Sequence, residues 1–174
     1  MQTGSIQAPA TGMRPLAPIR LSTGGVLLET ASVLMIAATF GALILTWNRL
    51  PPTVPIHFNF SGKPDAWGSR AVMWILPAMA AALYAAITWA ARLPQKFNYP
   101  VKISPRNAQR QYAIAVAMMR WIKAVLAAMV LVLTVQAIRV SLGSIDNIGR
   151  WLDILAVCFL GITGLYLFKA FRTT

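Results

Sequence analysis

Residues 50–69 have the types and spacing that best suit ligand binding in this chain. His57 and Asn59 alternate there with apolar residues, so an extended backbone would carry both side chains on one polar face. Asp65 and Trp67 follow a turn made of Ser, Gly, Lys and Pro, and a carboxylate at that place can accept hydrogen bonds from nearby amides. We therefore predict a ligand-binding surface that contains His57, Asn59, Asp65 and Trp67.

His57 is the only histidine of the chain, and an imidazole binds a metal, a proton or a ligand, or acts as a structural hydrogen-bonding group. Zinc sites take three or four protein ligands, but this segment has no cysteine and few carboxylates. The single cysteine, Cys158, stands in a distant apolar block. We predict no metal and no cofactor, and we favour a His57 that hydrogen-bonds to backbone groups or to Asp65.

Catalytic groups of the common kinds are not assembled in this sequence. No nucleophile stands beside a base, no glycine-rich loop suits a phosphate, and no two carboxylates form a pair. We therefore expect that the protein is not an enzyme.

The elements that position these residues are predicted to be membrane-spanning helices. Hydrophobic residues make up 57% of the chain and charged residues 11%, too few charges to cover a water-soluble globule. A bilayer core is crossed by about 20 helical residues. Four apolar blocks reach that length: residues 25–47, 71–91, 121–140 and 151–171. We predict an all-α integral membrane protein, with a disordered tail (1–22), one four-helix domain (23–172) and a short ordered connector after the first helix.

Glu29 and Gln136 are the two polar residues inside these blocks that are candidates for an intramembrane role. Glu29 lies about one turn into the first block, where an ionised carboxylate is costly and often functional. The other interpretation, which we favour slightly, places Glu29 at the interface, paired with Arg20 or with a basic residue of the second connector. Gln136, near the end of the third block, is expected to form an interhelical hydrogen bond and not to serve transport.

The basic residues indicate an orientation, because Lys and Arg are retained in the cytoplasm. Eleven of the sixteen lie in the tail, the second connector (92–123) and the C-terminus, and the other five lie on the opposite side of the membrane domain. We predict a multi-pass protein of the inner (plasma) membrane with cytoplasmic N- and C-termini. The net charge of +12 does not indicate nucleic-acid binding, because no loop is long enough to form a soluble basic module.

A basic amphipathic helix is predicted just before the third block and continuous with it. Arg106, Arg110 and Arg120 recur on one face of this helix. Lys123 is expected to extend its side chain back to the interface. These four residues are predicted to contact anionic lipid or a cytoplasmic protein partner.

The first connector is predicted to be an ordered cap on the membrane domain. Val54, Ile56, Phe58 and Phe60 alternate with polar residues, so one apolar face should be buried. Pro77 lies inside the second block, where a proline removes a backbone hydrogen bond and is expected to kink the helix.

The same connector carries a family resemblance. Its matching residues are Leu50-Pro51, Pro55, His57, Gly62, Pro64-Asp65 and Trp67-Gly68-Ser69. They resemble the signature of a bacterial membrane domain of unknown function, the N-terminal part of SdpI-like proteins, over about residues 32–80. Asn107 and Arg110-Gln111-Tyr112 are similar to a stretch that follows this domain. The resemblance implies immunity to a secreted peptide toxin and a relay to a cytoplasmic repressor, but the second half of the chain lacks the family's further motif.

Three functions are compatible with this sequence. The first is a non-enzymatic SdpI-like binding, immunity or signalling module that recognises an extracytoplasmic peptide or envelope component. The alternative is an accessory structural subunit of a larger membrane complex, and the third, a small transporter, is supported by Glu29 and Gln136 alone. The expected partners are the lipid bilayer, a peptide ligand or a larger membrane complex, and a cytoplasmic protein, without nucleic acid.

Overall fold

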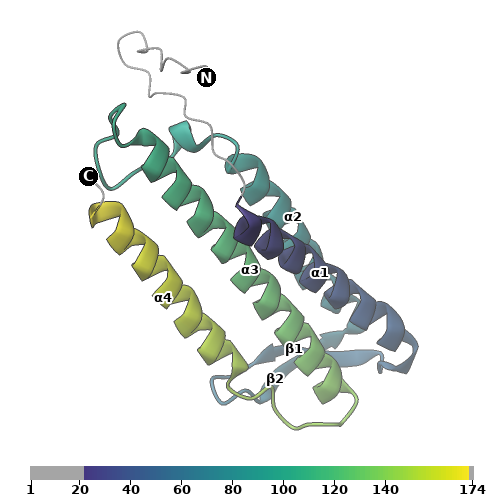
Figure 1. Cartoon of the computed structure of the whole chain (residues 1–174). Helices are drawn as coiled ribbons and strands as arrows, with labels where there is room; N and C mark the ends of the chain where they lie inside the picture. Colours follow the sequence, from purple (N-terminus) through teal and green to yellow (C-terminus); the bar gives the residue numbers. More distant parts are fainter. Residues whose placement is uncertain (1–21, 173–174) are drawn as a thin grey trace.

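The computed structural model describes residues 22–172, which form a bundle of four long helices with a β-hairpin at one end (Figure 1). The predicted tail, 1–22, falls outside this range except for its last residue. The helices are α1 (Thr23–Thr46), α2 (Ile75–Ala90), α3 (Ala108–Ser141) and α4 (Trp151–Arg172). Each is part of a segment long and apolar enough to cross a membrane. The predicted four-helix membrane fold is therefore confirmed.

Helix α3 is the central element of the bundle. It packs against α1, α2 and α4, whereas α4 packs mainly on α3 (Figure 1). Its 34 residues give a length of about 50 Å, more than the roughly 30 Å of a hydrocarbon core. The predicted amphipathic helix and third span are thus one continuous helix that connects the two ends of the molecule.

The two ends differ in their elements, and we name them accordingly. The hairpin end holds β1 (Thr53–Phe58), β2 (Pro64–Ser69) and the connector 142–150 between α3 and α4. The loop end holds the connector 91–107, with the short 3-10 helix η3 (Pro94–Lys96), the start of α1 and the end of α4 (Figure 1). Two further 3-10 helices, η1 (Trp47–Arg49) and η2 (Arg70–Trp74), join the hairpin to α1 and α2.

The strands β1 and β2 pair antiparallel, but the ladder is irregular. Pro55 pairs with Trp67 and His57 with Ala66, so Ile56 is an extra residue between two pairs. Val54 is fully buried, whereas Ile56 is half-exposed and Phe60, in the turn, is fully exposed. The prediction that all four alternating apolar residues share a buried face was therefore wrong, because the irregularity at Ile56 changes the phase of the alternation.

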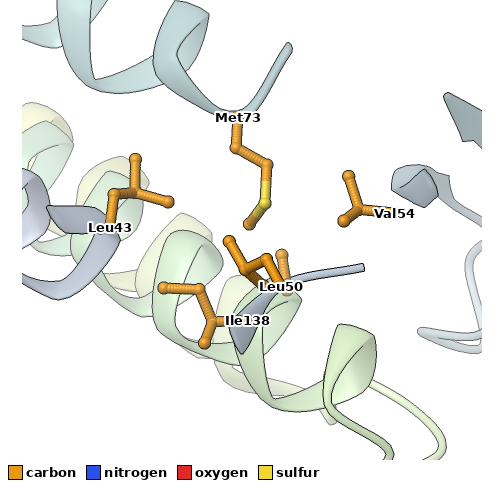
Figure 2. Packing of buried hydrophobic residues seen from close by; sticks show 6 residues of the cluster. Leu43, Leu50, Val54, Met73 and Ile138 are labelled. Carbon is orange, nitrogen blue, oxygen red and sulfur yellow. The ribbon is translucent and has the colours of Figure 1, made fainter. Parts of the chain in front are cut away.

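An apolar cluster at the hairpin end joins the hairpin to three helical elements (Figure 2). Its buried residues come from α1, from the residue after η1, and from β1, η2 and α3: Leu43, Leu50, Val54, Met73, Ala137 and Ile138. Arg70 supports this cluster from the side, since its guanidinium donates to the carbonyls of Trp47 (3.1 Å) and Leu50 (3.0 Å) and lies 4.7 Å from the Trp47 ring. The first connector is therefore an ordered part of the fold.

Pro77 lies inside the second span, Arg70–Ala90, as predicted. The second span opens with η2, and Pro77 is the third residue of α2, buried in its first turn. Amides of a first turn have no acceptor within their own α-helix. Pro77 therefore removes no hydrogen bond within α2, and the kink toward the outer end of the span stays a prediction.

Candidate functional site

A pair of polar side chains lies on the hairpin. The Nδ1 atom of His57 is 2.5 Å from Oδ1 of Asp65, and both side chains are largely exposed. The irregular register brings them together, because Asp65 is an extra residue between the His57–Ala66 and Phe58–Pro64 pairs. The predicted hydrogen bond between His57 and Asp65 is confirmed.

A pocket of about 510 Å³ surrounds this pair at the hairpin end. The hairpin supplies polar and apolar walls, α3 adds Leu133, the connector adds Ile148 and Gly149, and α4 adds Asp153. Three of the four predicted ligand-binding residues line it, namely His57, Asn59 and Asp65. Trp67 does not line this pocket, although its side chain is exposed elsewhere on the hairpin.

Asn59 has a structural task in the hairpin turn. Its Oδ1 atom accepts hydrogen bonds from the amides of Ser61 (2.9 Å) and Lys63 (3.1 Å). Gly62 follows in the left-handed conformation, with φ of 74°, and its carbonyl accepts from the amide of Ile148 at 2.9 Å. The tip of the hairpin is therefore fixed to the connector between α3 and α4.

Gln136 takes part in the same junction. Its Nε2 atom donates to the carbonyl of Ile148 (3.2 Å), and its Oε1 accepts from Arg139 (3.1 Å). The predicted interhelical bond is thus a bond between a helix and the connector. This contact holds the wall of the pocket in place.

A second polar cluster lies inside the bundle, where α1, α2 and α3 meet. Both carboxylate oxygens of Glu29 are 2.8 Å from Nζ of Lys123, and the hydroxyl of Tyr84 donates to Oε2 of Glu29 at 2.6 Å. Lys123 also donates to Thr88 (2.8 Å). The Nε atom of Arg120 is 3.6 Å from Oε1 of Glu29, an ion pair too long for a hydrogen bond.

The predicted extension of the Lys123 side chain to the membrane interface was wrong. Its side chain is 1% exposed, so it is enclosed between the helices and does not extend back to the interface. The physical reason is that α1 and α3 pack together, so that the Glu29 carboxylate is a nearer partner than the headgroup region. Glu29 does pair with basic residues of the segment 92–123, as one interpretation had it. Glu29 lies about 9 Å along α1, and Arg20, the other partner considered, lies outside the described residues.

Three residues of these clusters were not predicted from the sequence: Tyr84, Thr88 and the anchoring residue Arg70. Tyr84 and Thr88 stand four residues apart in an otherwise apolar span, so they share one helix face. That spacing was the available signal. For Arg70 no comparable signal exists, because its acceptors are backbone carbonyls 20 and 23 residues away.

The remaining predicted residues lie at the loop end. Arg106 and Arg110 are exposed, at and just before the start of α3. Their neighbours Gln111 and Tyr112 are buried: Gln111 donates to the carbonyl of Ala170 (2.9 Å), and the Tyr112 ring lies 5.6 Å from that of Tyr99. The basic face is therefore carried by a helix end that is packed on α4 and on the connector 91–107.

No three His, Cys, Asp or Glu residues gather as a metal site would require anywhere in the described range 22–172. His57 has Asp65 as its neighbour, and Asp153 pairs with Arg150 at 3.2 Å. His57, Asp65 and Asp153 supply hydrogen bonding and charge at the hairpin end, and Ile56 and Phe60 supply apolar surface.

The hairpin lies in a region that is similar to other proteins. Residues 34–81 match the model of a family described as Domain of unknown function (DUF1648), which here runs from α1 through the hairpin into α2. An uncharacterized protein of Archaeoglobus fulgidus is 36% identical over 93 residues, 49% of this chain and 51% of that protein. The chain thus aligns with about half the length of this relative, and no solved structure matches. This protein is a multi-pass membrane protein of unknown function that carries a DUF1648-like region around its hairpin.

Proposed function

We propose that this protein is a non-enzymatic, SdpI-like recognition module of a bacterial inner membrane, and that its hairpin end binds an extracytoplasmic peptide or envelope component. The supporting observation is the pocket of about 510 Å³, in which the His57–Asp65 pair and Asp153 meet exposed apolar side chains. Its volume lies within the roughly 300–1,000 Å³ range of ligand pockets.

The lining of the pocket suggests the chemistry of its ligand. Asp65 and Asp153 supply two carboxylates, and Ile56 and Phe60 supply exposed apolar surface. Exposed apolar side chains on an ordered element are typical of an interaction site. A peptide segment with a basic residue beside an apolar one would fit both features.

The charges support the proposed orientation. The four acidic residues are Glu29, Asp65, Asp146 and Asp153, and the three aspartates all lie at the hairpin end. Most Lys and Arg residues lie at the loop end, which the retention of basic residues assigns to the cytoplasm. The hairpin would then face outward, and both termini would be cytoplasmic.

Helix α3 could transmit ligand binding from the pocket to the cytoplasmic end of the protein. Helix α3 lines the pocket through Leu133 and carries Arg110 at its opposite end. A cytoplasmic protein that binds the basic helix end could thus sense a ligand through one continuous helix. The DUF1648-like match includes the whole hairpin, so this part of the chain is the part that resembles a known family.

Photocrosslinking in living cells tests this proposal. A benzoylphenylalanine at Phe60 should capture a peptide of the envelope, whereas the same group at Trp151, exposed at the same end but outside the pocket, should not. Asp65→Asn should abolish the product at Phe60. If the product at Phe60 is unchanged by Asp65→Asn or appears equally at Trp151, the pocket is not the recognition site.

An accessory subunit is the second candidate, and the arrangement of α4 favours it. This helix packs mainly on α3 and exposes a row of large apolar side chains, such as Val157, Leu160 and Phe168. A larger membrane protein could cover that face. A crosslinker at Leu160 that captures one partner in stoichiometric amount, with no product at Phe60, would support the subunit over the recognition module.

A further inference from the structure

A second hollow in the molecule is an apolar groove between α2 and α3. It has a volume of about 480 Å³, and Ile36 of α1 also lines it. Its walls are almost wholly apolar, and they include Met79, Ala82, Leu83, Ala86, Leu126 and Val130. Tyr84 and Lys123 also line it, so the groove adjoins the polar cluster around Glu29.

The volume and the lining of the groove suit a thin apolar occupant. Ala82 and Ala86 leave the α2 wall low, because neither side chain extends beyond Cβ. A transmembrane helix is about 10 Å across with its side chains, so little more than one of its turns would take up the whole volume of the groove. A single acyl chain is narrow and apolar enough to fill it.

The charges beside the groove select the headgroup of such an occupant. Glu29 is the only carboxylate near the cluster, and it faces two cations, Lys123 at 2.8 Å and Arg120 at 3.6 Å. The cluster therefore has one positive charge in excess. Arg120 lies on α3 one turn closer to the loop end than Lys123, which lines the groove.

The rest of the loop end also carries an excess of positive charge. Its other cations in the described range follow α2, precede or begin α3, or end α4: Arg92, Lys96, Lys102, Arg106, Arg110, Lys169 and Arg172. No acidic residue other than Glu29 is found on this half of the molecule. A lipid whose chain occupies the groove with its head at this end would meet cations, which favours an anionic headgroup.

We propose that the groove between α2 and α3 binds one acyl chain of an anionic phospholipid, whose phosphate lies at the loop end beside Arg120. This site is separate from the hairpin pocket and does not depend on the peptide ligand proposed above. The lipid supplies an anion to the excess cation of the cluster and an apolar filling to the groove.

Native mass spectrometry of the full chain in detergent tests the site, with phosphatidylglycerol and phosphatidylcholine as probes. The unmodified protein should retain one phosphatidylglycerol in preference to phosphatidylcholine. Ala82→Trp fills the groove and should lower retention about tenfold or more, a loss of about 1.4 kcal/mol. Ala85→Trp is the matched control, since Ala85 is an exposed α2 residue that does not line the groove.

Two further variants keep the test decisive. Ala86→Leu narrows the groove with a smaller change and should also lower retention if Ala82→Trp does not fold. Arg120→Gln should reduce the preference for phosphatidylglycerol about fivefold, the factor expected for one cation near an anionic headgroup, and should leave phosphatidylcholine binding unchanged. Equal retention by Ala82→Trp and Ala85→Trp, or no headgroup preference in the unmodified protein, would overturn the proposal. So would a dimer that Ala82→Trp dissociates, because a second copy would then cover the groove.

Discussion

At the hairpin end the helices meet through apolar side chains such as Leu43 and Met73, whereas nearer the loop end they meet through Glu29, Tyr84 and Lys123. The polar groups of the two regions also differ in exposure. The His57 side chain is 67% exposed, and that of Lys123 is 1% exposed. The His57–Asp65 pair of the hairpin end thus faces outward, whereas the interior cluster uses its polar groups to join three helices.

This difference determines what each region can do. An exposed ion pair contributes about 0–1 kcal/mol, so His57 and Asp65 are free to exchange partners with a ligand at little cost. Removing one member of a buried pair costs about 3–5 kcal/mol, because the other charge is left uncompensated. The exposed pair therefore suits the proposed recognition, and the interior cluster suits helix association.

The largest expected effect is the loss of the Glu29 carboxylate. Glu29→Leu leaves Lys123 and Arg120 without a counter-charge and should lower the free energy of unfolding by about 3–5 kcal/mol. Thermal unfolding of the detergent-solubilised protein measures the change. Glu29→Leu combined with Lys123→Met should recover most of the stability. If the single variant is as stable as the unmodified protein, the cluster does not hold the helices together.

A cavity in the apolar cluster should cost somewhat less. Leu43→Ala removes a fully buried side chain and should lower the free energy of unfolding by about 2–5 kcal/mol. Leu45→Ala, at an exposed position of the same helix, is the control and should have little effect. The same unfolding assay compares the two variants. Equal losses of unfolding free energy would show that the apolar cluster of Figure 2 does not stabilise the fold.

The hairpin turn gives a smaller effect. Gly62→Ala places a Cβ atom 3.3 Å from the Gly149 carbonyl at a φ of 74°, and such a left-handed residue costs about 1–2 kcal/mol. Limited proteolysis of the folded protein should then cut the hairpin faster. Gly41→Ala in α1, where no atom lies within 4 Å of the new Cβ, should leave the cutting rate unchanged or lower.

The smallest expected effect on stability is at the exposed pair. His57→Ala should lower the free energy of unfolding by less than about 1 kcal/mol, since both side chains remain in contact with solvent. The same substitution should nevertheless reduce crosslinking from Phe60 if His57 orients Asp65 toward a ligand. A loss of stability comparable with that of Leu43→Ala would mean that His57 is a structural residue and that the two regions do not differ as described.

The sequence alone determined the number, length and approximate limits of the helices. Within a bilayer every backbone group must be satisfied inside its own segment, so hydropathy predicts spans with few alternatives. It was also predictable that the first connector is an ordered segment, because the apolar alternation of Val54 and Phe58 and the turn at Gly62 are local signals.

Only the tertiary structure decided which polar groups meet. Glu29 and Lys123 are 94 residues apart, and their contact depends on how far α1 and α3 are shifted along each other, which no local pattern specifies. The buried place of Lys123 follows from that contact. The exposure of Ile56 follows from one extra residue in a strand pair, which a strict alternation cannot reveal. Local hydropathy thus specifies the elements of this protein, and the packing between distant segments specifies its sites.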